Sequence, residues 1–168
     1  MQLTIARPLE IPVFTQSMVI SNARHIVGSD VEDDGANYCH FSIESDGTLK
    51  FLSLLSSSIV ANIVSTPKFI DTTAFYHLVL RCDTTQSTAA DRVRIYVNGS
   101  QVTAFGTNTI PSQNDDLGLF KSGSATLIGA RHPSSSSNFF EGEMGMVCIA
   151  DGASLAPTVF GETDSTTG

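Results

Sequence analysis

A tight hairpin at residues 92–105 constrains the fold of this chain more than any other feature. Val93, Ile95 and Val97 alternate with polar or larger residues, and Asn98-Gly99 follows where the chain must reverse. Asn-Gly supplies the two positive φ angles of a type I′ turn, which suits the twist of two antiparallel strands. This segment therefore predicts a β-hairpin that turns one face toward a core.

Similar signals recur along the chain at short spacing. Residues 38–54 predict a second hairpin that turns at Asp46-Gly47, and the apolar run at residues 75–82 predicts a central strand buried on both faces. Further strands are expected at residues 18–27, 59–64, 125–129 and 143–150. No helical periodicity lasts longer than about one turn. These signals predict an all-β chain folded as a two-sheet antiparallel β-sandwich of the jelly-roll type.

Composition fits this architecture. The chain contains 21 Ser and 17 Thr among its 168 residues, only 15% of the residues are charged, and Trp is absent. Many β-branched and small polar residues with few charges are typical of an all-β domain rather than a helical bundle. The length suits one domain, which we place at residues 18–168. Pro8 and Pro12 predict an N-terminal arm at residues 1–17.

The chain is acidic, with a net charge of −8 from 9 basic and 17 acidic residues. Because affinity for nucleic acid depends on Lys and Arg that neutralise phosphates, we expect no nucleic-acid partner. No run approaches the roughly 18 apolar residues of a membrane span, and no secretory signal begins the chain, so we expect synthesis in the cytoplasm and no membrane partner. Residues 141–168 contain five acidic residues and no basic one, which suits either head-to-tail contacts between copies or a solvated end.

Four segments resemble those of laminin-G-like, concanavalin A-like jelly-roll domains in order and spacing. They are FYHLVLRCD at residues 75–83, RVRIYVNG at 92–99, LIG at 127–129, and FEGEM at 140–144 followed by DGASLAP at 151–157. Phe75 stands where this family usually has Trp. In addition, residues 111–114 and 160–164 are similar to a subgroup of such domains in phage virion and tail-associated proteins. The resemblance implies a sandwich of the lectin/glucanase type and a place in a virion.

The acidic loop at residues 29–35 is a candidate calcium site. Asp30, Asp33 and Asp34 bring carboxylates into one loop, and such loops at the rim of a sandwich bind Ca²⁺. The loop begins like an EF-hand, but Phe41 occupies position 12, where that motif needs Glu. The alternative is a solvated acidic turn without a metal, and we expect no other cofactor.

Sugar sites combine an aromatic ring with amide or carboxylate groups. The loops at residues 29–37, 112–118 and 131–140 supply such groups, and the candidate ligand-binding residues are Asp33, Asn37, Asn114, Asn138 and Phe139. Tyr96 faces away from the apolar residues of its own strand, so we expect its ring to be exposed. Trp, which could supply such a ring, is absent.

The family includes glucanases, whose strand E-x-D-x-x-E carries the catalytic carboxylates. The nearest match begins at Glu141 and Glu143, but Met146 occupies the third position. Because a thioether can neither donate nor accept the required proton, we predict that the chain is not an enzyme.

The preferred hypothesis is therefore a non-enzymatic structural or decoration protein of a phage virion, present in multiple copies and attached to neighbouring capsid or tail subunits. The alternative is an adhesion module that binds a host-surface glycan through its rim loops. A glucanase-type hydrolase is the third and disfavoured hypothesis.

Overall fold

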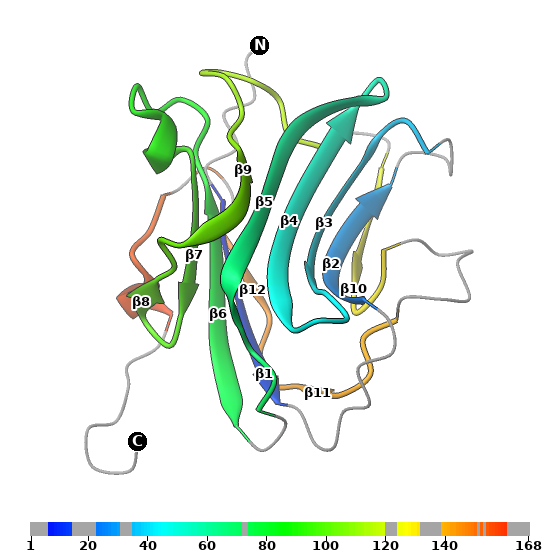
Figure 1. Ribbon diagram of the computed structural model, residues 1–168, viewed down its shortest axis with the longest axis vertical. Coiled ribbons are helices and arrows are strands. Elements are labelled where there is room, and N and C mark those ends of the chain that lie inside the picture. Colours follow the sequence, from blue (N-terminus) through cyan, green and yellow to red (C-terminus); the bar gives the residue numbers. More distant parts are fainter. Residues whose placement is uncertain are drawn as a thin grey trace.

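The computed structural model describes residues 7–14, 23–30, 35–71, 74–119, 124–131, 139–150, 152 and 154–160, with the backbone alone for residues 7–14. Two antiparallel sheets stack face to face and form a sandwich, as expected (Figure 1). None of the helices in these residues is long and apolar enough to cross a membrane.

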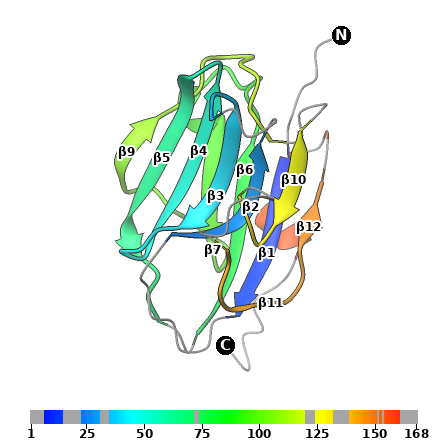
Figure 2. The same cartoon turned by 90° about the vertical axis from the view of Figure 1, so that its right-hand side faces the viewer.

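Sheet B contains six strands in the order β10-β2-β3-β4-β5-β9, which Figure 2 shows side by side. Their bounds are β2 (Arg24–Asp30), β3 (Tyr38–Ile43), β4 (Thr48–Leu55), β5 (Ser58–Lys68), β9 (Phe105–Thr109) and β10 (Ala125–Ile128). Since β2, β3, β4 and β5 follow one another along the chain, the centre of this sheet is a simple meander.

Sheet A has the order β11-β1-β6-β7-β8, and β12 also pairs with β1. Its strands are β1 (Arg7–Phe14), β6 (Phe75–Cys82), β7 (Val93–Val97), β8 (Ser100–Gln101), β11 (Glu143–Met144) and β12 (Cys148–Ile149). Two single turns of 3₁₀ helix, η1 (Ala89–Asp91) and η2 (Pro157–Val159), complete the described elements.

The core lies between the two sheets. Phe41 and Phe51 of sheet B are buried with Leu78, Leu80 and Ile95 of sheet A in one apolar cluster. In β3 and in β6, successive side chains therefore point alternately into this cluster and away from it. This alternation leaves sheet B with an outward face that does not belong to the core.

Both predicted hairpins are confirmed. Asn98 and Gly99 have φ angles of +49° and +77°, as a type I′ turn between β7 and β8 requires. Asp46 stabilises the other turn, because its Oδ1 accepts hydrogen bonds from the backbone N and the hydroxyl of Thr48. The prediction of a central strand at residues 75–82 is also correct, since β6 pairs with both β1 and β7 and buries Leu78 and Val79 on opposite faces.

Residues 7–14, which we expected within an N-terminal arm, form β1 and pair with β6 over their whole length. Leu9, Ile11 and Val13 alternate with other residues in this segment, and this alternation favours a strand even though two prolines are present. Pro8 and Pro12 are four residues apart, so both missing N–H groups face the same neighbour. The role of the remaining residues of 1–17 in attachment stays a prediction.

Three other segments differ from expectation. Residues 105–109 form the edge strand β9, although Gly and Asn in this segment indicated a loop. Residues 143–150 form two short strands that pair with β1, β11 and β12, instead of one continuous strand. The ring of Tyr96 was expected to be exposed but is buried, with 8% of its surface accessible.

Candidate functional site

The structure gives the candidate asparagines structural partners. The side-chain oxygen of Asn37 accepts a hydrogen bond of 2.9 Å from the backbone N of Ser56, which holds the turn between β4 and β5. Asn114 has a φ angle of +66°, and its backbone N donates to the carbonyl oxygen of Thr84 at 2.8 Å. Asp33 and Asn138 lie outside the described residues.

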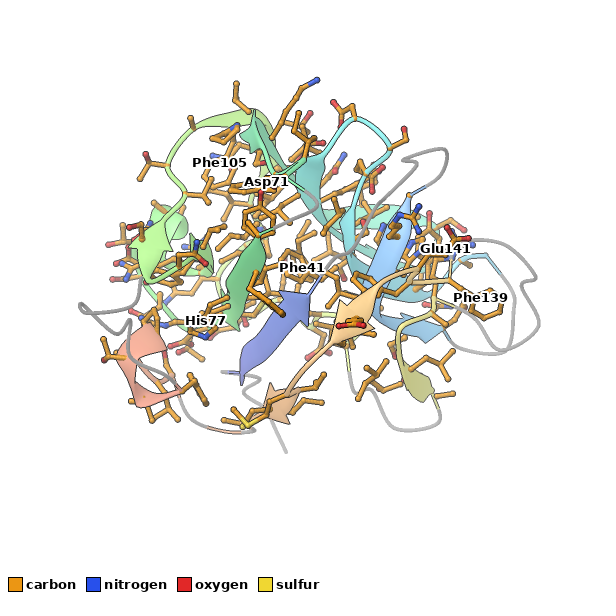
Figure 3. All side chains as sticks on the ribbon, turned by 90° about the horizontal axis from the view of Figure 1, so that it is seen from below. Phe41, Asp71, His77, Phe105, Phe139 and Glu141 are labelled. Atoms are coloured by element: carbon orange, nitrogen blue, oxygen red, sulfur yellow. The ribbon has the colours of Figure 1, made fainter. Side chains whose placement is uncertain are left out.

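Phe139 lies at the opposite end of sheet B from Asn37. Asn37 directly precedes Tyr38, which pairs with Asp30 at the end of β2, whereas Arg24 begins β2 and binds the carboxylate of Glu141 at 2.7 Å. Figure 3 shows Phe139 and Glu141 near each other in the view from below. The ring of Phe139 is half exposed. The predicted ligand-binding residues that are described therefore do not form one site.

The candidate calcium residue Asp30 is buried in β2, opposite Tyr38 of β3. Within the described ranges, no three His, Cys, Asp or Glu side chains are grouped so that they could hold a metal ion. Asp33 and Asp34 lie outside those ranges, so a calcium site in this loop stays a prediction.

The three residues at the glucanase motif have different surroundings. Glu141 is bound to Arg24, Glu143 is an exposed residue of β11, and Met146 is exposed over 56% of its surface. A retaining hydrolase needs two carboxyl groups about 5 Å apart on either side of the scissile bond. Met146 cannot supply the second one.

The outward face of sheet B presents a different set of polar and aromatic side chains. In β3, Cys39, Phe41 and Ile43 point into the core, so Tyr38, His40 and Ser42 point outward. The strand pairing extends this face into three rows across the sheet. The rows are Asp30–Tyr38–Leu54; Gly28–His40–Leu52–Asn62–Thr109; and His25–Ser42–Lys50–Val64–Thr107.

The chain that leaves β10 crosses directly over Gly28. A Cβ atom at Gly28 would lie 2.5 Å from the Cα of Arg131 and 2.6 Å from the carbonyl oxygen of Ala130. Only glycine permits such a close approach of two backbones. The approach places the guanidinium of Arg131 over the ring of Tyr38, at 4.9 Å from the ring centroid, which is a cation–π contact.

His40 is the second residue of the middle row, between Gly28 and Leu52. Its ring stacks parallel to that of Tyr38 at 6.0 Å and meets the ring of His25 edge-on at 4.5 Å. Burial lowers the pKa of His40 well below its ordinary value, and the positive charges of His25, Lys50 and Arg131 lower it further. His40 is therefore neutral at pH 7 in an environment that already favours negative charge.

Three polar atoms on or over this face are buried without a hydrogen-bond partner, namely Nδ1 of His40, Nε of Arg131 and Oδ1 of Asn62. Each unpaired group costs roughly 1–3 kcal/mol of folding free energy. His40 and Asn62 are two strands apart, which corresponds to about 10 Å. We call Tyr38, His40, Lys50, Asn62 and Arg131 the His40 face. It offers an aromatic ring, a donor, an acceptor and two permanent positive charges.

A separate pocket of about 190 Å³ lies between the edge strands β8 and β9. The ring of Phe105 and the side-chain amides of Gln101 and Asn108 line it, and Figure 3 shows Phe105 on the side of the molecule away from Phe139. It contains no positive charge. This pocket is the alternative place for a neutral ligand.

Sequence patterns missed the His40 face because its parts come from distant segments. The alternation of Tyr38, His40 and Ser42 with the apolar residues of β3 was a usable signal, since it predicts which side chains point outward. The loop at residues 131–140 was a predicted binding loop, and it contributes Arg131 to the site. Nothing local, however, indicated that Arg131 lies over Gly28.

Comparison with known proteins identifies the relatives of this fold. The family model described as the concanavalin A-like lectin/glucanases superfamily matches residues 15–159. No curated protein sequence matches the chain.

Two solved structures of the CBM40 of the Ruminococcus gnavus IT-sialidase are similar to this chain. The CBM40 bound to α2,3-sialyllactose has 12% identity and a TM-score of 0.63, over 95% of this chain and 84% of that chain. A second structure of the same CBM40 has 11% identity and a TM-score of 0.62, over 96% and 85% of the two chains. A SAP-like pentraxin from Limulus polyphemus has 16% identity and a TM-score of 0.48, over 94% and 70%. At these identities the likeness concerns the fold.

Proposed function

Since this chain belongs to the concanavalin A-like lectin/glucanase superfamily, we propose that it is a non-catalytic, lectin-like domain that binds a glycan on the outward face of sheet B. The observation that carries the proposal is the His40 face, where three buried polar atoms on or over one face of the sheet have no hydrogen-bond partner. Buried polar groups are almost always hydrogen-bonded, so the unpaired atoms mark this face as incomplete. A ligand with several hydroxyl groups would bind the accessible outer groups of the same side chains.

The chemistry of the His40 face suits a sugar. Arg131 covers one face of the Tyr38 ring, and the uncovered part of the ring can contact an apolar C–H group of a sugar. Arg131 and Asn62 offer a donor and an acceptor on the same face of the sheet. Tyr38, Arg131 and Asn62 are each half-buried, so their outer parts remain accessible. The CBM40 modules that share this fold at TM-scores of 0.62 and 0.63 include one bound to sialyllactose, which supports a glycan as the ligand class.

The experiment is a glycan array followed by calorimetry of the best ligand. We expect binding by the unaltered protein, at least a tenfold loss of affinity in Tyr38→Leu, and unchanged affinity in the control Asn108→Ala, which alters the pocket at β9. Thermal unfolding by circular dichroism verifies that both variants are folded. Absence of any bound glycan overturns the function, and a loss confined to Asn108→Ala overturns the choice of site.

The absence of catalysis is part of the proposal. It is supported by Met146 at the third position of the glucanase motif and by the ion pair that Glu141 makes with Arg24. Assays of β-glucan hydrolysis should give reducing ends at the rate of the buffer blank. A rate above the blank that scales with protein concentration contradicts this part.

The place proposed for the domain is a phage virion, in multiple copies beside capsid or tail subunits. This rests on the resemblance of residues 111–114 and 160–164 to virion-associated domains and on the acidic end at residues 141–168. Capsid, portal and tail genes next to the gene for this chain, with copurification in intact particles, would support the placement. A neighbourhood without virion genes would overturn it.

A further inference from the structure

We infer that the ligand of the His40 face carries an acidic sugar, whose anionic group is held between Arg131 and Lys50. This inference rests on the proposed glycan binding and adds the class of ligand. It follows from three observations on charge, which concern Arg131, the surroundings of His40 and the acidity of the rest of the chain.

Arg131 is a cation without a counter-charge. Several other basic side chains are engaged, since Arg24 binds Glu141, Lys68 lies 3.5 Å from Asp46, and Arg94 binds Asp91. Arg81 of sheet A resembles Arg131 in having a buried Nε without a partner, but it lies away from the His40 face. Among the described residues, Arg131 has neither an ion pair nor a hydrogen bond, and its Nε is buried without an acceptor. In a chain with 17 acidic and 9 basic residues, an unpaired arginine indicates that its anion comes from outside.

Positively charged groups surround His40. His25, Lys50 and Arg131 all act on the His40 ring. Of the carboxylates on the same face, Glu44 accepts a hydrogen bond from the hydroxyl of Ser42 and lies 4.0 Å from Lys50, while Asp30 belongs to the neighbouring row beside Tyr38. Glu44 thus neutralises part of the charge of Lys50. None of these contacts reaches Arg131.

The net charge of the rest of the molecule limits how many negative charges the ligand can carry. A net charge of −8 repels polyanions such as nucleic acids, whereas a single carboxylate or sulfate on a sugar is repelled weakly and gains the local attraction of Arg131 and Lys50. The planar guanidinium of Arg131 can bind a carboxylate through two parallel hydrogen bonds. The part of the Tyr38 ring that this guanidinium leaves uncovered provides a contact for the sugar itself.

The test compares three ligands that share one neutral core: 3′-sialyllactose, 3′-sulfolactose and lactose. The first adds a carboxylate and the second a sulfate, so the pair distinguishes the two sources of negative charge. Calorimetry at low ionic strength should give at least tenfold higher affinity for one acidic ligand than for lactose. Raising the salt concentration should reduce this preference, because the contact is electrostatic and partly exposed.

Two variants separate the acidic subsite from the rest of the face. Arg131→Gln should reduce affinity for the acidic ligand at least tenfold more than it reduces affinity for lactose, since Gln keeps a hydrogen-bonding group but removes the charge. Lys68→Gln removes one exposed positive charge elsewhere and should leave the preference intact.

Equal affinity for lactose and both acidic ligands, with loss of all three in Tyr38→Leu, overturns the acidic subsite and leaves the glycan function standing. A preference that survives Arg131→Gln also overturns it. No binding of any glycan by the unaltered protein overturns the proposed function itself.

Discussion

Two polar regions of this sandwich differ in how their polar groups are satisfied. The rim cluster, formed by residues 83–92 and 111–114, is held together by internal hydrogen bonds. Arg92 donates from Nε to the carbonyl oxygen of Gln86, from Nη1 to that of Pro111 and from Nη2 to that of Ser87. The carboxylate of Asp83 accepts from Thr85 and Gln86.

The pKa of Asp83 reflects these hydrogen bonds. Burial acts to raise the pKa of Asp83, but hydrogen bonds from Thr85 and Gln86 and the charge of Arg81 outweigh it, and the pKa lies below its ordinary value. The rim cluster thus contributes stability that is present at neutral pH and is lost as the pH falls below about 4.

The His40 face is the opposite case. Nδ1 of His40, Nε of Arg131 and Oδ1 of Asn62 are buried and unpaired, and burial with neighbouring positive charges lowers the pKa of His40. A protein retains groups that cost folding free energy where they serve another purpose. The contrast therefore supports a structural role for the rim cluster, although its loop contains a sequence-based candidate, and it supports the proposed binding role of the His40 face.

The largest expected loss of stability follows from a substitution that disrupts the rim cluster. Arg92→Ala removes three hydrogen bonds from a charged donor to backbone carbonyls and should lower the free energy of unfolding by about 3 kcal/mol. Urea denaturation monitored by far-UV circular dichroism measures this change. At a temperature where the variant is folded, glycan affinity should be unchanged; a selective loss of affinity with full stability would place ligand binding at the rim.

A smaller loss of stability is expected at the crossing of two backbones. Gly28→Ala inserts a methyl group 2.5 Å from the Cα of Arg131 and forces the crossing segment outward, at a cost of about 2 kcal/mol. Displacement of Arg131 should also abolish the preference for acidic ligands.

Gly106→Ala is the matched control for Gly28→Ala, because no atom lies within 4 Å of the added methyl group in strand β9. Its free energy of unfolding should stay within about 0.5 kcal/mol of the unaltered protein. If both substitutions destabilise equally, the close approach at Gly28 is not the cause.

The parts of this fold that could be predicted are those whose signal lies within a few neighbouring residues of the sequence. Asn98-Gly99 fixes its turn within a few residues, and the apolar alternation in β3 fixes which side chains enter the core, so both hairpins were predictable. Strand β9 was not, because Gly106 and Asn108 carry no local strand preference and pair with β5 only through the tertiary fold.

The site was less accessible to prediction for the same reason. Tyr38 and His40 could be assigned to an outward face from β3 alone. Arg131 reaches them only because Gly28, in another strand, lets the chain cross above it. Asn37 and Asn114 have the composition of binding residues, yet their positions are explained by the turns that they stabilise.

A third variant should make the His40 face more stable and less functional. His40→Leu replaces a buried ring that has an unpaired nitrogen with an apolar side chain of similar volume, so the free energy of unfolding at pH 6 should rise by about 1 kcal/mol. Affinity for the glycan should fall. A variant that is less stable than the unaltered protein would show that the unpaired nitrogen is not costly.

The same variant tests the sign of the pH dependence. Because the folded-state pKa of His40 is lowered, the unfolded chain binds more protons at this residue, and stability should decrease as the pH falls below the unfolded-state pKa of about 6.5. Denaturation between pH 7.5 and 5 measures this slope. In His40→Leu the slope should be reduced, whereas a slope equal to that of the unaltered protein would assign the dependence to another group.

The smallest expected effect on stability concerns Arg131, the residue expected to determine the preference for acidic ligands. Arg131→Ala removes the cation–π contact with Tyr38, worth about 0.5 kcal/mol at a partly exposed site, and breaks no ion pair. Thermal unfolding should therefore barely shift, while calorimetry should show loss of the acidic ligand. Arg92→Ala should show the opposite pattern, with a large loss of stability and no change in ligand specificity. If Arg131→Ala destabilised the domain as much as Arg92→Ala does, the unpaired arginine would be a structural element, and the distinction between the two regions would fail.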